Sequence, residues 1–260
     1  MLFRKGGTAS AILAVALLVA ILASMNSIAN HINWQTEVLG GYVNLSGTFL
    51  ILSRNSTSIT DSKIDAELTS LLNNITDVEY TLPQRILTAT LTTNSGNHTT
   101  LMRGVEDVSN FLELRRAYVN GTSAKSEAEA NVGEILARLS ATDLGDEVNL
   151  TVDNTALKVK VVGVVKTLTQ NDAELIVPME AIHHFTGNDG KVSIIEFTLK
   201  EDVKEEAILN LIKLLPTDVK VVKAQQLKEF MQDMNSQTLT FLNLWSIAVY
   251  AVVAAASYVV

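Results

Sequence analysis

The sequence has 260 residues, no cysteine and a net charge of −8. Without cysteine, the chain has no disulfides, no thiolate metal sites and no cysteine nucleophile. All 28 acidic residues and all but two of the 20 basic residues lie within residues 26–238. That segment therefore carries a net charge of −10, which argues against nucleic acid as a partner.

Two uncharged apolar runs bracket this acidic segment. The first, Gly6–Met25, follows two basic residues, and the second is Leu239–Val260. A bilayer core about 30 Å thick needs roughly 20 apolar residues of helix, so we predict transmembrane helices within residues 1–25 and 239–260. Because basic residues beside a span stay cytoplasmic, we expect a multi-pass plasma-membrane protein with both termini cytoplasmic and residues 26–238 outside.

A cleaved signal peptide is the alternative for the first run. The run is long for that role, and Ala23–Asn26 is a poor small-x-small cleavage site. We therefore favour an uncleaved anchor. The outer segment also holds six Asn-x-Ser/Thr sequons, which chance also produces in an Asn-, Ser- and Thr-rich chain. We treat them as candidate N-glycosylation sites: Asn44, Asn55, Asn74, Asn97, Asn120 and Asn149.

Apolar residues repeat in steps of three and four just outside each span, which predicts stalk helices at residues 26–39 and 225–238. The alternative is that both seams pack against the floor of the outer domain. We favour stalks, because both seams continue into the spans. The candidate coupling residues in the stalks are Ile28, Ile32, Leu227, Met231 and Met234.

Strands and helices alternate between the stalks. The predicted elements before the inserted lobe are a strand at Tyr42–Ser53, a helix at Asp61–Asn74, and a hairpin of Arg85–Thr93 with His98–Val105. Those after it are a strand at Val192–Leu199, a helix at Asp202–Leu215 and a strand at Asp218–Lys223. These two halves form one lobe that is split in sequence, residues 42–105 and 191–224.

Residues 106–190 form an inserted, mostly-β lobe. Its predicted helices are Asp107–Ala117, Ala128–Ser140 and a turn at Glu180–Phe185, and a further turn falls at Asn120–Thr122. The predicted strands are Glu147–Val152, Leu157–Val165 and Glu174–Val177, the last stopped by Pro178. Gly163 inside a strand indicates a bulge or a close backbone approach. The fold class is therefore α+β, a two-lobed extracytoplasmic domain between two transmembrane helices.

This order of elements resembles the periplasmic core domain of MacB/FtsX-type ABC transporter permeases. The cues are a Gly-x-x-x-Ala helix within Asn131–Leu139, a Gly-Asp turn within Leu144–Leu150, a Val-x-Gly strand within Val159–Val165, and a strand closed by proline within Ala173–Met179. The resemblance covers almost the whole chain. It implies a split porter-like lobe with an inserted lobe, the two lobes defined above.

The resemblance also implies a function. Permeases of this family act as dimers with separate cytoplasmic ATP-binding subunits, and movement near the membrane passes up the stalk. We therefore expect a membrane permease component with a homodimeric or second permease partner, in contact with membrane lipid. Its outer domain would couple the ATPase to export or mechanical work. The family's cytoplasmic helix before the first span and its third and fourth spans are absent, which leaves open a fragment, a split permease or a reduced relative.

Signals for chemistry are weak. Gly187–Lys191 lacks the spacing of a phosphate-binding loop, and the adjacent His183 and His184 point about 100° apart on a helix. The acidic groups fit solvated turns and helix starts: Glu127 with Glu129, Asp143 with Asp146 and Glu147, and residues 201–206. We expect no enzyme activity and name no catalytic, cofactor or metal residue. The alternative function is a membrane-anchored extracellular binding domain without transport.

Overall fold

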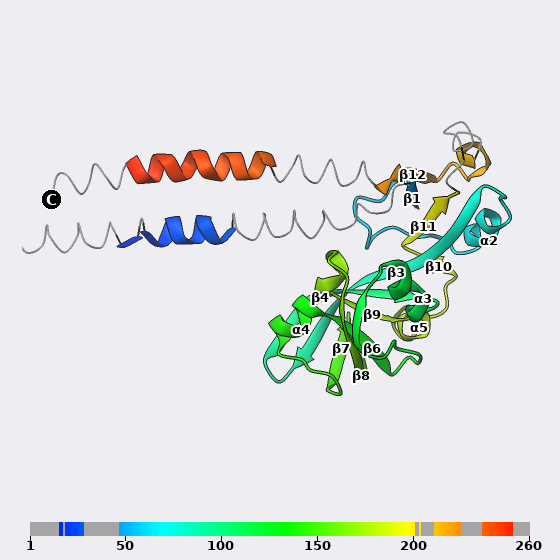
Figure 1. The fold of residues 1–260 in the computed structure, drawn as a ribbon, viewed down its shortest axis with the longest axis horizontal. Helices are drawn as coiled ribbons and strands as arrows, with labels where there is room; N and C mark the ends of the chain where they lie inside the picture. Colours follow the sequence, from blue (N-terminus) through cyan, green and yellow to red (C-terminus); the bar gives the residue numbers. More distant parts are fainter. Residues whose placement is uncertain are drawn as a thin grey trace, which may run out of the picture. The chain divides into compact units, whose positions relative to one another are not determined.

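The computed structural model describes residues 16–17, 19–28, 47–200, 203, 211–224 and 236–251. The chain divides into two units, residues 41–227 and a unit made of residues 1–40 with 228–260. In the second unit, residues 19–28 and 236–251 are helical (Figure 1). None of the helices in the described stretches combines the length and the apolar character that a membrane crossing requires. The predicted spans extend beyond these stretches.

The folded unit, residues 41–227, is built around one sheet. Its described helical elements are α2 (Leu68–Asn73), α3 (Val108–Leu114), α4 (Glu134–Ser140), η2 (Gln170–Ala173), α5 (Met179–Thr186) and residues 211–214. Its strands are β1 (Thr48–Ser53), β2 (Ile64–Asp65), β3 (Val78–Thr93), β4 (Gly96–Val105), β5 (Tyr118–Gly121), β6 (Glu129–Gly133), β7 (Glu147–Val152), β8 (Thr155–Lys166), β9 (Glu174–Pro178), β10 (Lys191–Val192), β11 (Ile194–Leu199) and β12 (Val219–Lys223).

Ten of the described strands form the main sheet, in the order β12-β1-β11-β3-β4-β9-β6-β8-β5, with β7 pairing with both β3 and β8. Six of them close on themselves, because β3, β4, β9, β6, β8 and β7 each pair with the next and β7 returns to β3. We call these six strands the strand ring. The ring contains β6, β7, β8 and β9 of the inserted lobe together with the long hairpin β3–β4, whereas β5 pairs with β8 outside the ring. The split lobe and the inserted lobe therefore share that hairpin (Figure 1), and the predicted α+β fold is confirmed.

The two faces of β3 and β4 are packed differently. One face carries a continuous apolar core that runs from α2 and β11 through the interior of the ring to α5. We call it the α5 face. The opposite face carries α3, whose Val108, Phe111 and Leu112 pack on Leu82 and Val105. We call it the α3 face. A separate small cluster around Leu52, Ile86 and Ile194 lies further along the α3 face.

Three predicted elements were wrong. Ala128–Ser140 is not one helix, because residues 129–133 form β6 between β8 and β9 and only Glu134–Ser140 is helical. Asp61–Asn74 divides into β2 and the shorter α2, because Ile64 pairs with Val192. Asn120 lies in β5 rather than in a turn. In each case pairing with a distant strand overrides the local propensity.

The prediction for Gly163 was confirmed. The β6–β8 register shifts between Ala130 and Asn131, opposite this glycine. A Cβ atom on Gly163 would lie 2.4 Å from Asn131 Nδ2 and 2.5 Å from the Thr122 carbonyl oxygen. Asn131 is fully buried and uses the same amide to bond that carbonyl at 2.8 Å. Glycine is therefore required here by a close approach of side chain and backbone.

Candidate functional site

The predicted coupling residues are largely outside the described part of the chain. Ile28 lies in the helical stretch 19–28 and is half exposed. Ile32, Leu227, Met231 and Met234 lie outside the described residues. The stalk assignment therefore stays a prediction.

Five of the six sequon asparagines are described, and all five are exposed; Asn44 lies outside the described residues. Two of them lie on β4 and β7, the strands on either side of β3, because Thr92 pairs with Asn97 of β4 and with Asn149 of β7. Directly paired residues project from the same face of a sheet. Asn97 and Asn149 therefore flank Thr92 on one exposed surface.

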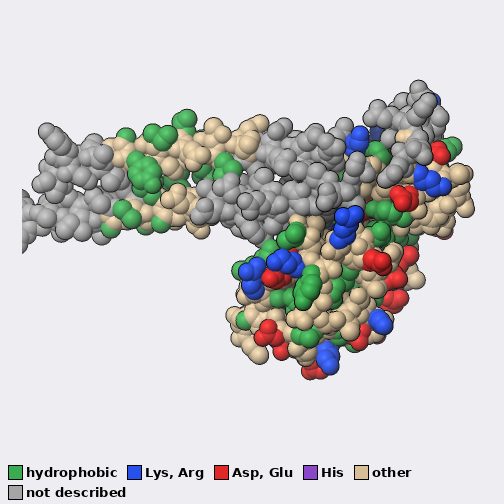
Figure 2. Space-filling model, in the orientation of Figure 1, with side chains coloured by type: hydrophobic (Ala, Val, Ile, Leu, Met, Phe, Trp, Pro, Cys, Tyr) green, Lys and Arg blue, Asp and Glu red, His purple; other side chains and the backbone are tan. Residues whose placement is uncertain are grey.

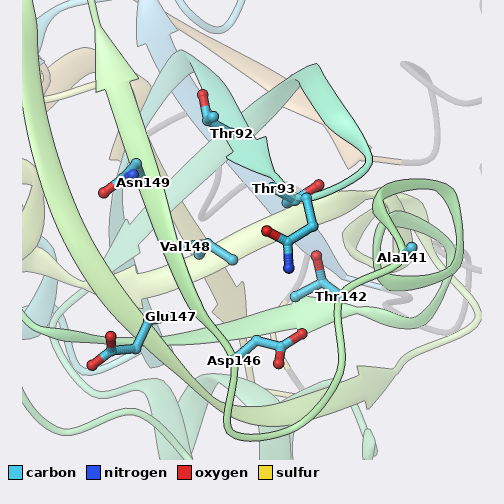
Figure 3. Close-up of a pocket in the computed structure, with 9 residues that line it drawn as sticks. Thr92, Thr93, Ala141, Thr142, Asp146, Glu147, Val148 and Asn149 are labelled. Carbon is cyan, nitrogen blue, oxygen red and sulfur yellow. The ribbon is translucent and has the colours of Figure 1, made fainter.

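One predicted acidic group lines a polar pocket of about 290 Å³ between the β3–β4 hairpin tip, the end of α4 and the start of β7 (Figure 3). Two carboxylates of this group line the pocket, those of Asp146 and Glu147, and both have protein partners. Asp146 accepts a hydrogen bond from the Asp143 backbone N–H at 2.8 Å, and Glu147 forms an ion pair with Lys158 at 2.5 Å. The hydrogen bond from Lys158 lowers the pKa of Glu147. These contacts match the turn expected from the sequence and leave neither carboxylate assigned to chemistry.

The other candidate metal and acid–base residues that the structure describes are dispersed, and the acidic residues of the group 201–206 lie outside the described residues. His183 and His184 lie on α5, where the His184 ring packs edge-on against Phe185. Glu129 accepts a hydrogen bond from the Lys125 backbone N–H at 2.8 Å. Within the described residues, no three His, Cys, Asp or Glu side chains gather as a metal site would require.

The most unusual feature of the folded unit is a connected series of buried charged side chains on the α3 face. Arg115 donates to Glu196 through two nitrogens, Nη1 to Oε1 at 2.9 Å and Nη2 to Oε2 at 2.5 Å. Arg103 contacts Glu174 in the same way, Nε to Oε2 at 2.6 Å and Nη2 to Oε1 at 2.9 Å. Such bidentate, charge-assisted pairs are the strong form of hydrogen bond in proteins.

Gln84 of β3 stands between the two pairs. Its Nε2 donates to Glu196 Oε2 at 3.0 Å, and its Oε1 accepts from Arg103 Nη1. All three side chains are at most 3% exposed. In such surroundings an unpaired polar group is costly, so every member depends on its neighbours.

The chain of contacts is anchored at both ends. Asn171 of η2 donates to Glu174 Oε2 at 2.8 Å. Arg115 follows α3 and lies over the Phe111 ring at 4.7 Å. The contacts therefore run from α3 across β11, β3, β4 and β9 to η2. We call these six residues the junction network: Gln84, Arg103, Arg115, Asn171, Glu174 and Glu196.

The sequence gives a weak signal for this network. Arg103 interrupts the run from Leu101 to Val105, and Glu196 interrupts the run from Ile194 to Leu199. A charged residue inside an apolar strand needs a buried partner. Only the strand order supplies the identity of that partner, so the sequence alone places Glu196 within the predicted strand Val192–Leu199 and gives it no role.

The surface of the folded unit is consistent with a water-exposed domain. Figure 2 shows acidic side chains spread over the visible face, with lysines and arginines among them.

A family model described as the MacB-like periplasmic core domain matches residues 8–215. The chain therefore belongs to this family, as the resemblance in the sequence implied.

Solved structures agree with this assignment. The periplasmic region of MacB from Actinobacillus actinomycetemcomitans matches with a TM-score of 0.55 and 14% identity, covering 72% of this chain and 94% of that one. The extracellular domain of YknZ, a noncanonic ABC-type transporter from Gram-positive bacteria, matches with a TM-score of 0.51 and 15% identity, covering 68% of this chain and 100% of that one. At these identities the likeness shows the fold. No curated protein matches the sequence.

Proposed function

We propose that the chain is a plasma-membrane permease component of an ABC transporter, anchored by two helices with both termini cytoplasmic. Its outer domain couples a separate cytoplasmic ATP-binding subunit to export or mechanical work outside the membrane. The chain works as a homodimer or beside a second permease chain, contacts lipid through its spans, and performs no chemistry itself. Membership of the MacB-like family supports this proposal.

One structural observation supports the proposal in addition to family membership. Phe49 near the start of β1 pairs with Lys223 at the end of β12. The first and the last described strands of the folded unit therefore start and finish at the same end of the sheet. A pair of helices that transmit movement needs such a common point of attachment, and from there the sheet continues through β11 and β3 into the strand ring.

The test starts with the full chain purified in detergent from its native membranes. We expect an ATP-binding subunit to co-purify and to hydrolyse ATP. Because the chain has no cysteine, two introduced cysteines can carry spin labels that report movement of the outer domain during turnover. In the double variant Met231→Gly, Met234→Gly, the domain stays folded and the subunit stays bound, but turnover no longer moves the labels.

A matched control is Asn243→Gly within the second predicted span, which places the same residue outside the stalk. Co-purification of a binding partner without any ATP-binding subunit would support the tethered binding domain instead. Unchanged label movement in the Met231→Gly, Met234→Gly variant would remove the stalk from the mechanism.

Glycan addition outside the cell is part of the same topology. We propose that the exposed sequon asparagines carry N-linked glycans in the native membrane. Mass spectrometry of tryptic peptides before and after enzymatic deglycosylation measures occupancy at each site. The variant Asn74→Gln removes one site as a control, and unmodified peptides at all five described sites would contradict the proposal.

A further inference from the structure

Gln84 occupies a special position in the backbone of the sheet. It is paired with Ile194 of β11 on one side and with Val105 of β4 on the other. In the described registers, the β3 residues before it pair with β11, and those after it pair with β4. Gln84 is thus the residue at which β3 passes from the split lobe into the strand ring.

The side chain of Gln84 makes the same connection. It bonds Glu196 of β11, which is held by Arg115, and it bonds Arg103 of β4, which is held by Glu174 of β9. A carboxylate offers only acceptors and a guanidinium offers only donors. A primary amide carries one donor group and one acceptor group, so glutamine fits between these two partners in a single orientation.

The surroundings of Gln84 make this link directional. On the α5 face, the two lobes are joined by apolar packing, which is non-directional. On the α3 face, the apolar cluster beneath α3 and the cluster around Ile86 lie on either side of the junction network. Gln84 is fully buried between them. A low-dielectric setting of this kind strengthens each hydrogen bond and penalises its loss.

We infer that Gln84 is a positioning residue that couples the split lobe to the strand ring. A displacement of β11 moves Glu196. Gln84 transmits this displacement to Arg103, and through Arg103 to β4 and β9. The inference deepens the proposed function, because it names the point at which movement that enters through β1 and β12 crosses into the ring.

The experiment perturbs one end of the network and measures the other. Glu174→Gln on β9 removes the charge that faces Arg103 while keeping the shape of the side chain. Amide hydrogen exchange of the full chain in detergent then reports on β11, relative to the β8 amides. With Gln84 present, we expect exchange in β11 to accelerate about tenfold, the effect of weakening one buried charge-assisted bond. In the Gln84→Met background, Glu174→Gln leaves β11 exchange unchanged.

Two further variants serve as controls for this experiment. Glu147→Gln removes an exposed carboxylate on the ring surface, paired with Lys158, and must leave β11 exchange unchanged. Gln84→Glu keeps the acceptor for Arg103 but sets a second carboxylate against Glu196, so it should abolish the transmission as Gln84→Met does. It also serves as the background if Gln84→Met does not fold.

Two results would overturn the inference: β11 exchange that ignores Glu174→Gln with Gln84 present, or exchange that responds equally in the Gln84→Met background. If neither Gln84 variant folds, Gln84 is a structural residue and the inference also fails. The measurement needs no ATPase. Failure of the inference is therefore distinguishable from failure of the proposed function, which is tested by co-purification and ATP turnover.

Discussion

The α5 face and the α3 face of β3 and β4 are both buried, but they achieve burial by different means. On the α5 face, one apolar core runs without interruption from α2 to the interior of the ring. On the α3 face, four strands are crossed by two bidentate ion pairs with a glutamine between them. Apolar packing tolerates small slips, whereas a hydrogen-bonded network fixes partners individually. The comparison suggests that the α3 face sets the register between the lobes.

Two buried arginines sharpen this contrast. Arg103 on the α3 face is 3% exposed and its guanidinium is engaged by Glu174 and Gln84. Arg85 on the α5 face is equally buried, but its closest carboxylate oxygen, on Asp189, lies 3.8 Å away. The Nε and Nη1 atoms of Arg85 have no hydrogen-bond partner in the described structure. Each guanidinium nitrogen of Arg103 therefore has a hydrogen-bond partner, whereas the guanidinium of Arg85 is poorly satisfied.

The largest effect is expected from Arg103→Met. This variant leaves Glu174 buried without its cation, and breaking one side of a buried ion pair costs about 3–5 kcal/mol. Urea unfolding of the full chain, followed by the circular dichroism of the backbone, measures the loss of unfolding free energy. The double variant Arg103→Met, Glu174→Met removes the orphaned charge and should recover much of the stability. A loss below about 1 kcal/mol in the single variant would mean that the pair behaves as an exposed one.

A smaller effect is expected on the apolar face from Gly104→Ala. A Cβ atom at Gly104 would lie 2.1 Å from Ile182 Cγ1, where α5 packs against β4. Overpacking of this kind costs about 1–3 kcal/mol, again measured by urea unfolding. Ile182→Ala combined with Gly104→Ala opens the space that the added methyl needs. If the double variant is less stable than Ile182→Ala alone, the contact with Ile182 is not the cause.

Arg85→Met should have little cost, because it removes a charge that the fold does not satisfy well. Methionine keeps the length of the side chain, and volume-conserving changes in a core cost less than about 1.5 kcal/mol. We expect a change in unfolding free energy between zero and a small gain. Measured beside Arg103→Met, it tests the difference between the faces directly. Equal losses of unfolding free energy in the two variants would contradict the proposed difference between the two faces.

Local signals in the sequence were sufficient for much of the fold. The hairpin around Asn94–Asn97 was confirmed, and so was the short helix α3. Its N-cap residue, Asp107, accepts a hydrogen bond from the Asn110 backbone N–H at 3.0 Å. The strand stopped by Pro178 and the tight approach at Gly163 were confirmed as well. The hairpin, the cap and the proline stop each depend on residues close in sequence, where turn, capping and proline residues act. The glycine signal at Gly163 was also local, although the atoms it approaches belong to the distant Asn131 and Thr122.

What the sequence could not supply depends on distant partners. β6 is a strand because β8 and β9 flank it, although the Glu- and Ala-rich run at residues 127–130, which leads into it, favours a helix. The junction network could not be predicted for the same reason, since Gln84 and Glu196 are 112 residues apart. Closure of the ring needs both strand order and register, and these are properties of the assembled sheet.

The smallest effect concerns an exposed carboxylate, which separates hydrogen bonding from burial. The pKa of Asp61 is lowered from 3.8 to about 2, first by the Thr57 hydroxyl and then by the Ser58 backbone N–H. The Thr57 Oγ1 donates to Asp61 Oδ2 at 2.7 Å, and the Ser58 nitrogen donates to Oδ1 at 2.9 Å. Because the folded pKa lies below the unfolded one, this stabilisation is complete above pH 3.8 and is lost as the pH falls through about 2.

Thr57→Val removes the hydroxyl and should raise the pKa of Asp61 towards 3.8, as measured by an NMR titration of the carboxyl carbon. Thr60→Val is the matched control, because the Thr60 hydroxyl bonds Ser58 and not Asp61. An unchanged pKa in Thr57→Val would assign the shift to the remaining donors, which are the two backbone N–H groups and the Ser58 side chain. The shift is expected although Asp61 is exposed, so a hydrogen bond without burial adds a pH-dependent stabilisation. Inside the junction network, buried bonds of the same kind connect neighbouring strands.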